Sequence, residues 1–211
     1  MGVESVRQAS VGRGLDTSQS PESEEIRIDL QEDPEYPLEF DELPDYPFPD
    51  QTIVRGEYYY ESSPRFGDPE TGEGSFQMRT GSGMAILHTQ NDRPRPKKIF
   101  SSLNQAINGD AEIKKNFVPN QNRVWQFIER GNLRDLKVIT PSGRIKSAME
   151  IDVEWDDMKG KYPVELAVLE FTLDGEAIRV RYHDDSLEIQ SCDGREREYV
   201  IQIFESVMAE R

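Results

Sequence analysis

Three carboxylates at alternate positions are spaced so that they could act together in a chemical reaction. Glu150, Asp152 and Glu154 alternate with apolar residues, a pattern typical of a β-strand over residues 150–155. Carboxylates on one face of a strand lie about 6.5 to 7 Å apart, and such oxygen ligands could hold a divalent cation for hydrolysis. A solvated outer sheet face would carry the same residues. A metal-dependent hydrolase is therefore one hypothesis, set against a purely structural role.

A second group of residues could bind anions. Residues 93–148 contain twelve Lys and Arg residues and four acidic ones. The basic run over 93–98 coincides with the start of a predicted helix, where positive charge opposes the helix dipole but exposed N–H groups can bind phosphate or carboxylate. The alternative is a solvated turn whose charges are screened by salt. The predicted anion-binding or nucleic-acid-binding residues are Arg93, Arg95, Lys97, Lys98, Lys114, Lys115, Arg123, Arg130, Arg134, Lys137, Arg144 and Lys146.

A third segment could bind a partner through aromatic side chains. Residues 22–50 contain twelve acidic residues and one Arg, interleaved with apolar residues and five prolines. Because proline excludes a long helix, we expect this segment to follow an extended path as a strap along a protein surface. The alternative is a solvated acidic tail. The predicted partner-binding residues of the strap are Tyr36, Phe40, Tyr46 and Phe48.

The other residue types that usually do chemistry show no recognisable arrangement. Cys192 is the only cysteine, which excludes an intramolecular disulfide, and His88 and His183 have no second ligand at metal-binding spacing. Nucleophile-elbow and phosphate-loop motifs are also absent from the sequence. We therefore predict no catalytic residue, no metal ligand and no cofactor. Trp125 falls on an apolar helical stripe, so we expect it in the core.

The charge is sorted along the chain, and this bears on location and partners. The net charge of −16 combines −11 over residues 22–50 with +8 over residues 93–148. Acidic and basic regions of one chain can attract each other or compete for one partner. No apolar run approaches the roughly 18 residues of a membrane span, and the first residues do not resemble a signal peptide. We expect a cytoplasmic protein that does not bind membranes.

The elements that position these residues are predicted from periodicity and turn residues. We expect residues 1–21 to be disordered and residues 1–50 to form a tail. A single domain over 51–211 follows, in which residues 62–75 form a loop. Strands are predicted over 53–62, 76–79 and 84–89, and a helix after Pro96. Helices around 113–117 and 124–128, followed by a hairpin from residue 136, have the outline of a winged helix.

The C-terminal part carries the strongest turn signals. Asp174-Gly175 predicts a two-residue hairpin, which sets Phe171 opposite Ile178, Leu169 opposite Val180 and Glu170 opposite Arg179 as a cross-strand ion pair. A second turn at residues 184–185 keeps the same apolar face, and a final helix follows Gly194. The strand–turn–strand–helix order occurs twice, at an offset of 103–104 residues. The predicted fold class is α+β, a mostly antiparallel sheet with helices on one side, a possible internal β3α duplication and a disordered N-terminal tail.

These observations favour a non-enzymatic binding or adaptor protein. Its basic central region, residues 93–148, would bind an anionic partner, with nucleic acid as one candidate, and the strap would dock on that region or recruit another protein. A tethered strap would compete with the partner, so deleting residues 1–50 should raise the affinity for nucleic acid. One alternative is an acidic protein-interaction protein or nucleic-acid-mimic inhibitor, and another is the metal-dependent hydrolase. A protein partner is expected, and the oligomeric state is left open.

Overall fold

The computed structural model describes residues 2–11, 22–30, 43–63, 68–90, 93–107, 111–183, 186–191 and 193–209. The chain forms two compact units. The N-unit comprises Gly2–Pro37 and Phe48–Phe117, and the C-unit comprises Leu38–Pro47 and Val118–Arg211. The predicted tail (1–50) and the predicted domain (51–211) therefore both supply residues to both units.

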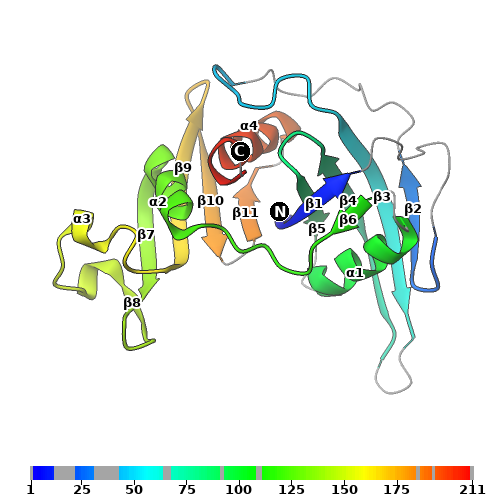
Figure 1. Cartoon of the computed structure of the whole chain (residues 1–211), viewed down its shortest axis with the longest axis horizontal. Coiled ribbons are helices and arrows are strands. Elements are labelled where there is room, and N and C mark those ends of the chain that lie inside the picture. The colour runs from blue at the N-terminus through cyan, green and yellow to red at the C-terminus, as the bar shows by residue number, and fades with distance from the viewer. Residues whose placement is uncertain are drawn as a thin grey trace. The chain divides into compact units, whose positions relative to one another are not determined.

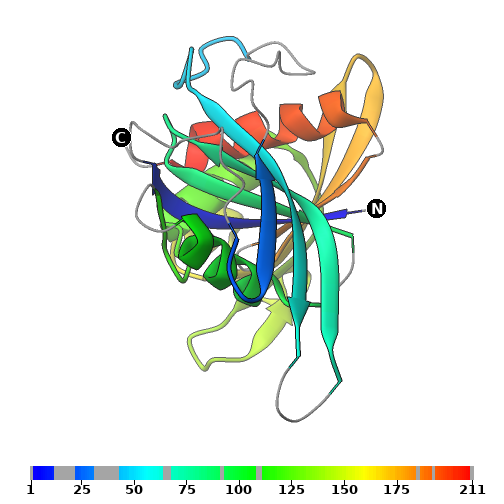
Figure 2. The same ribbon diagram turned by 90° about the vertical axis from the view of Figure 1, so that its right-hand side faces the viewer.

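The N-unit is an antiparallel sheet with one helix. Its strand order is β2-β3-β4-β5-β1, and the short β6 pairs with the end of β1 (Figures 1 and 2). The helix α1 contacts β2, β5 and β6. The elements are β1 (Gly2–Val11), β2 (Ile26–Leu30), β3 (Ile53–Ser62), β4 (Glu70–Arg79), β5 (Met84–Thr89), α1 (Pro96–Ile107) and β6 (Ala111–Ile113).

Alternation along the strands builds the core of the N-unit. In β3, Tyr58 and Tyr60 are buried, while the alternate residues Glu57 and Tyr59 are exposed. These two tyrosines share one buried cluster with Phe76 and Met78 of β4 and with Ile99 and Leu103 of α1, so one sheet face is the core face. The opposite face carries the polar residues discussed below.

The predicted disorder of the N-terminus is wrong for residues 2–11 and 22–30. Residues 2–11 form β1, in which Val6 and Ala9 are buried, and residues 26–30 form β2, in which every second side chain is buried. Both strands contain too few apolar residues to form a core alone. They fold because β3, β5 and α1 supply the rest of the apolar surface and the backbone partners.

The strands of the C-unit are antiparallel and follow the order β11-β10-β9-β7-β8. The helices α2 and α4 contact each other and the strand β9 (Figure 1). The elements are α2 (Gln121–Arg130), β7 (Asn132–Ile139), β8 (Ile145–Ser147), the 3₁₀ helix η1 (Ala148–Glu150), α3 (Trp155–Met158), β9 (Val164–Leu173), β10 (Glu176–His183), β11 (Ser186–Gln190) and α4 (Gly194–Met208).

Local signals determine the C-unit hairpins and helix starts as predicted. Asp174 (φ 51°) and Gly175 (φ 90°) form the turn, and the pairs Phe171–Ile178, Leu169–Val180 and Glu170–Arg179 are in the predicted register. The Asp193 side chain accepts a hydrogen bond from the backbone N–H of Arg195 and caps α4. The helix around 124–128 and its end at Gly131 are also confirmed.

An aromatic cluster joins α2 and α4 to one face of the C-unit sheet. The Phe127 ring of α2 lies 5.7 Å from that of Phe171, 6.3 Å from that of Tyr182 and 5.2 Å from that of Phe204 of α4. Phe127 is fully buried, and Trp125 is buried as predicted, with its indole N–H donating to the carbonyl of Tyr162. Both long helices therefore cover the same sheet face.

Three predicted elements are wrong. Strand β4 begins at Glu70, inside the predicted loop 62–75, because β3 provides a partner along its whole length. The predicted helix at 113–117 is absent, since residues 111–113 pair with β1 as β6. The predicted winged-helix outline, which needs that helix, is therefore also wrong. Residues 150–155 are not a strand: they contain the end of η1, a bend and the start of α3.

The predicted internal duplication stays a prediction. Both units contain four consecutive antiparallel strands followed by a helix, namely β2-β3-β4-β5 before α1 and β7-β9-β10-β11 before α4. In the C-unit the β8, η1 and α3 elements are inserted between β7 and β9.

Candidate functional site

The twelve predicted anion-binding residues are divided between the two units. Arg93, Arg95, Lys97 and Lys98 are exposed at the start of α1, and Lys114 and Lys115 are exposed after β6, all in the N-unit. The C-unit contains the remaining six: Arg123, Arg130, Arg134, Lys137, Arg144 and Lys146.

Several of these cations have partners inside their own unit. The Lys98 ammonium lies 2.6 Å from the Glu70 carboxylate, and this hydrogen bond lowers the pKa of Glu70 and raises the pKa of Lys98. The Arg134 guanidinium lies 2.6 Å from the Glu170 carboxylate and lowers its pKa in the same way. Glu170 was predicted to pair with Arg179, which is opposite in register, but the bond is made by Arg134.

Two further cations hold backbone and amide groups. Arg123 donates to the carbonyl oxygens of Val207 and Ala209 at the end of α4, where a cation favours the helix dipole. Lys114 donates to the Gln8 side chain of β1 over 2.8 Å. Within the described ranges, Lys137, Arg144 and Lys146 on the β7–β8 hairpin have no such partner.

One part of the strap docks on the same chain. Tyr46 is buried, and its hydroxyl donates to the Glu205 carboxylate of α4, while the backbone N–H of Leu43 donates to the Gln202 side chain over 2.9 Å. Leu43–Pro47 and α4 border a cavity of about 490 Å³ that Arg130 also lines. Phe48, partly buried, belongs to the N-unit. Tyr36 and Phe40 lie outside the described residues.

The carboxylates of residues 150–154 do not share a strand face. Glu150 ends η1, Asp152 lies in the following bend and Glu154 precedes α3, and all three are exposed. Among the residues that the structure describes, no three His, Cys, Asp or Glu side chains are placed to hold a metal ion. The geometric basis of the hydrolase hypothesis is therefore wrong.

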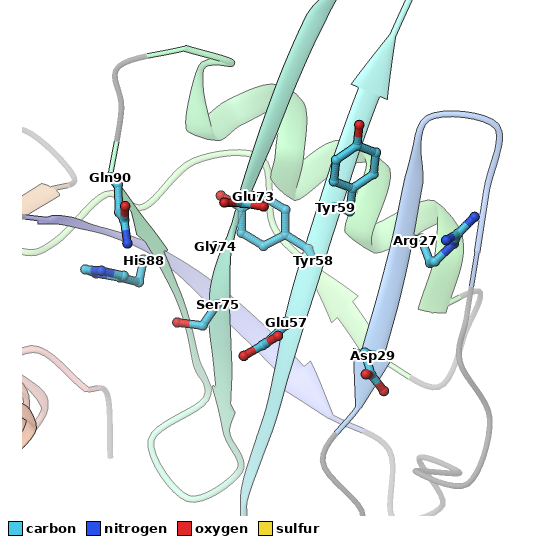
Figure 3. Close-up of a pocket in the computed structure, with 10 residues that line it drawn as sticks. All are labelled: Arg27, Asp29, Glu57, Tyr58, Tyr59, Glu73, Gly74, Ser75, His88 and Gln90. Atoms are coloured by element: carbon cyan, nitrogen blue, oxygen red, sulfur yellow. The ribbon is translucent and has the colours of Figure 1, made fainter.

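A polar site within one unit lies on the open face of the N-unit sheet (Figure 3). It is a shallow pocket of about 480 Å³, bordered by β2, β3, β4 and β5. Strand register places five side chains in one row across the sheet, each directly opposite the next. In order across the sheet, the row is Asp29, Glu57, Ser75, His88 and Glu4.

A second row of side chains lies on the same sheet face, two residues along each strand from the first. Arg27 is opposite Tyr59, and Tyr59 is opposite Glu73. Figure 3 shows Glu57 and Ser75 between Asp29 and His88, with Arg27 at the far edge of the pocket. The lining therefore combines three exposed carboxylates with one Arg, one His and an exposed Tyr.

His88 is held in the pocket by a buried carboxylate. Its Nδ1 lies 2.7 Å from Oε2 of Glu4, whose side chain is 1% exposed. The contact between Nδ1 and Glu4 fixes the orientation of the imidazole ring. Ser75 follows His88 in the row, which is the residue order of a hydrolytic triad. Carboxylates at Glu57 and Glu73 would repel the oxyanion of such a reaction, so the electrostatics favour binding over acyl transfer.

Tyr58 also borders the pocket, although its side chain lies on the core face of the sheet, where Gly74 leaves room for it. A Cβ on Gly74 would lie 2.3 Å from the backbone oxygen of His88 and 2.8 Å from the Tyr58 hydroxyl. Only glycine permits this close approach between β3, β4 and β5. Burial raises the pKa of Tyr58 from 10.0 to about 12.

The raised pKa of Tyr58 predicts a loss of stability in alkali. The unfolded chain loses the Tyr58 proton near pH 10, whereas the folded chain keeps it to about pH 12. The stabilisation is therefore complete below about pH 10 and falls as the pH rises through 12. Urea unfolding between about pH 9 and pH 11.5 should show a shallower decline for Tyr58→Phe than for the wild type. Equal declines in the two proteins would contradict this assignment.

Sequence reasoning missed the pocket for identifiable reasons. Alternation in β3 and β4 indicates that Glu57 and Glu73 face outward, but it does not indicate which strands are neighbours. Glu4 lay in a segment predicted to be disordered, so its bond to His88 could not be foreseen. The one available signal was the polar face opposite the apolar residues of 53–62.

The comparisons with known proteins add no function. None of the helices in the described ranges is long and apolar enough to cross a membrane. No protein-family model matches the sequence, and a search of curated proteins finds no match.

Proposed function

We propose that the protein is a non-enzymatic binding protein, and that the polar pocket of the N-unit takes a positively charged group of its partner. The predicted adaptor function remains part of this proposal. The proposal adds a cation-binding site, which the sequence did not identify, to the predicted anion-binding residues.

The main observation behind this proposal is that Asp29 and Glu57, two carboxylates, lie directly opposite each other on neighbouring strands. Like charges directly opposite on neighbouring strands destabilise a sheet by a few tenths of a kcal/mol to about 1 kcal/mol. Glu73 lies on the next row and adds a third carboxylate. Within the described ranges, none of the three has a Lys or Arg at ion-pair distance, and Arg27 has no carboxylate. A bound cation would offset this repulsion.

The other lining groups define the chemistry of the ligand. Ammonium and guanidinium groups donate several N–H bonds, which the carboxylates of the pocket can accept. The exposed Tyr59 ring can lie against such a cation. We therefore assign the pocket to an amine or guanidinium group, carried by a polyamine or by a Lys or Arg side chain of a protein.

Calorimetric titration of the full chain with spermidine and with N-acetyl-arginine amide tests this assignment and separates the two ligand sources. Glu57→Gln and Glu73→Gln should each weaken binding about tenfold, the loss of one charge-assisted hydrogen bond. Glu61→Gln is the matched control because Glu61 is exposed on β3 outside the pocket. Its affinity should equal that of the wild type, and binding should weaken with salt.

Unfolding measurements add an independent result. Removing the like charge should raise the free energy of unfolding of Glu57→Gln by about 0.2 to 1 kcal/mol at low salt. A variant that is more stable and binds less tightly is the outcome expected of a ligand site. No binding of either probe, or equal losses in Glu57→Gln and Glu61→Gln, would overturn the proposal.

A further inference from the structure

A pocket of the C-unit lies where the strap meets two helices. It has a volume of about 490 Å³ and is bordered by Leu43–Pro47, by Arg130 at the end of α2 and by one face of α4. The α4 residues are Tyr199, Ile203 and Ser206, each three or four positions from the next, so they lie on one side of the helix. The volume is within the range of about 300 to 1,000 Å³ that is usual for small-molecule sites.

The strap wall of this pocket is fixed to α4 at two points. The backbone N–H of Leu43 donates to the Gln202 side chain over 2.9 Å, and the Tyr46 hydroxyl donates to the Glu205 carboxylate. Gln202 and Glu205 are both fully buried. Hydrogen bonds that are shielded from water are strong, so we expect the wall to keep its position without a ligand. A pocket that is already formed loses little conformational entropy on binding.

A tight turn places Asp45 at the pocket. The backbone N–H of Tyr46 donates to the carbonyl of Leu43 over 3.0 Å, so residues 43–46 form a β-turn. Pro44 is the second residue of the turn, and Asp45, the third, has a φ of 62°, which is the type II arrangement. Glycine or Asn is the usual third residue of such a turn. The chain instead has a residue there that brings a negative charge to the pocket.

The pocket is lined by one carboxylate and one guanidinium that do not pair. Asp45 and Arg130 are both exposed, and neither side chain forms a hydrogen bond or an ion pair with any residue in the described part of the chain. The two are therefore not at ion-pair distance from each other. A ligand with a single charge would match one of them and meet a like charge at the other, which costs affinity. A ligand with two opposite charges matches both.

The other lining groups suit a peptide. The Ser206 hydroxyl donates to the carbonyl of Ile203 over 2.7 Å, so its oxygen can accept a hydrogen bond from an N–H group of a ligand. Tyr199 contributes an aromatic ring, and Pro44, Pro47 and Ile203 contribute apolar surface for side chains. A dipeptide or tripeptide has an amide N–H, side chains and two opposite terminal charges.

We propose that this pocket binds a short peptide with free termini, its ammonium group at Asp45 and its carboxylate at Arg130. A guanidinium can donate two parallel N–H bonds to a carboxylate, and an Asp carboxylate accepts from an ammonium group. A free amino acid has the same two charges but no amide between them. The site lies in the C-unit and does not rest on the proposed function of the N-unit pocket.

Calorimetric titration of the full chain with leucyl-leucine and its two blocked forms tests the proposal. N-acetyl-leucyl-leucine lacks the ammonium and leucyl-leucine amide lacks the carboxylate, so each should bind about tenfold or more weakly than the free dipeptide. Binding should also weaken with salt. Leucine and trileucine test the length of the ligand, and leucine should bind less tightly than the peptides. Leucine that binds as tightly as both peptides would overturn the peptide assignment in favour of a free amino acid.

Two substitutions assign each charge to one end of the peptide. Asp45→Asn introduces a residue that also tolerates a positive φ, and it should remove the preference for the free over the acetylated dipeptide. Arg130→Gln should remove the preference for the free over the amidated dipeptide. Each variant should keep the preference that the other loses. A mere loss of structure would instead weaken all three ligands together, so this crossed pattern is specific to the proposed orientation.

Matched controls exchange the same charges outside the pocket. Asp152→Asn and Arg144→Gln change exposed side chains of the C-unit that do not line it, and both variants should bind leucyl-leucine as the wild type does. Glu57→Gln should also leave this binding unchanged, which separates the site from the N-unit pocket. No binding of any probe, equal affinities for the free and blocked dipeptides, or equal losses in Asp45→Asn and Asp152→Asn would overturn the proposal.

Discussion

Deleting residues 1–50 should unfold the N-unit. The deletion removes β1 and β2, and with them the buried side chains of Val6, Ile26, Ile28 and Leu30. Burial of one such side chain contributes about 1.5 to 3 kcal/mol. Four of them amount to about 6 to 12 kcal/mol, which equals the whole stability of a typical domain. The deletion also leaves β3 without its partner β2, and β5 without its partner β1.

Amide hydrogen exchange measures this effect strand by strand. In the truncated chain, the amides of β3 and β4 should exchange at nearly unfolded rates, whereas in the full chain they should be among the most protected. Asp29→Asn is the control, because Asp29 is an exposed residue of β2 and its substitution leaves the core intact. Native protection of β3 and β4 in the truncated chain would show that the N-terminal strands are dispensable.

This expectation changes how the predicted competition by the strap has to be tested. If deleting residues 1–50 increased the affinity for nucleic acid, the increase could come either from unfolding of the N-unit or from removal of the strap. The deletion alone does not separate these two causes. Tyr46→Ala in the full chain is the better variant, since Tyr46 docks on α4 within the C-unit. The competition itself stays a prediction.

Phe127→Ala should destabilise the C-unit by about 3 to 5 kcal/mol. Phe127 is fully buried and contacts three other aromatic rings, so truncation removes apolar contacts and leaves a cavity that α2, β9 and α4 cannot all close. Edge-to-face contacts with Phe204 and Tyr182 add to the loss. Urea unfolding followed by circular dichroism gives the free energy.

Two variants calibrate that measurement. Phe127→Leu keeps most of the buried volume and should cost no more than about 1.5 kcal/mol. Gln126→Ala, at the exposed neighbouring position of α2, should stay within about 0.5 kcal/mol of the wild type. A loss below about 1 kcal/mol for Phe127→Ala would mean that the cluster does not hold the two helices together.

Elements that depend on local chemistry could be predicted from the sequence. The Asp174-Gly175 turn needs two residues with positive φ, and the turn alone sets the register of β9 and β10. The start of α4 follows from Asp193, and the core position of Trp125 follows from helical spacing. In each case the responsible residues lie within a few positions of each other.

Elements that depend on distant partners could not be predicted. β1 contains only a few buried apolar residues and folds because β5 and β6, some eighty to a hundred residues away, pair with it. Ile113 has the spacing of a helix with Phe117, yet pairing with β1 decides its conformation. The pocket has the same origin, since Asp29, Glu57 and His88 meet only through the register of separate strands.

The composition of the two units has a consequence for how this protein can be inherited and rearranged. Leu38–Pro47 belongs to the C-unit, while the chain before and after it belongs to the N-unit. No single cut in the gene yields either unit complete, so recombination cannot transfer one of them by a simple end-to-end fusion. A recombinant protein that received only residues 118–211 from this chain would contain α4 but would lack the Tyr46 side chain that hydrogen-bonds to it. Transfer of either unit by recombination would therefore need more than one crossover.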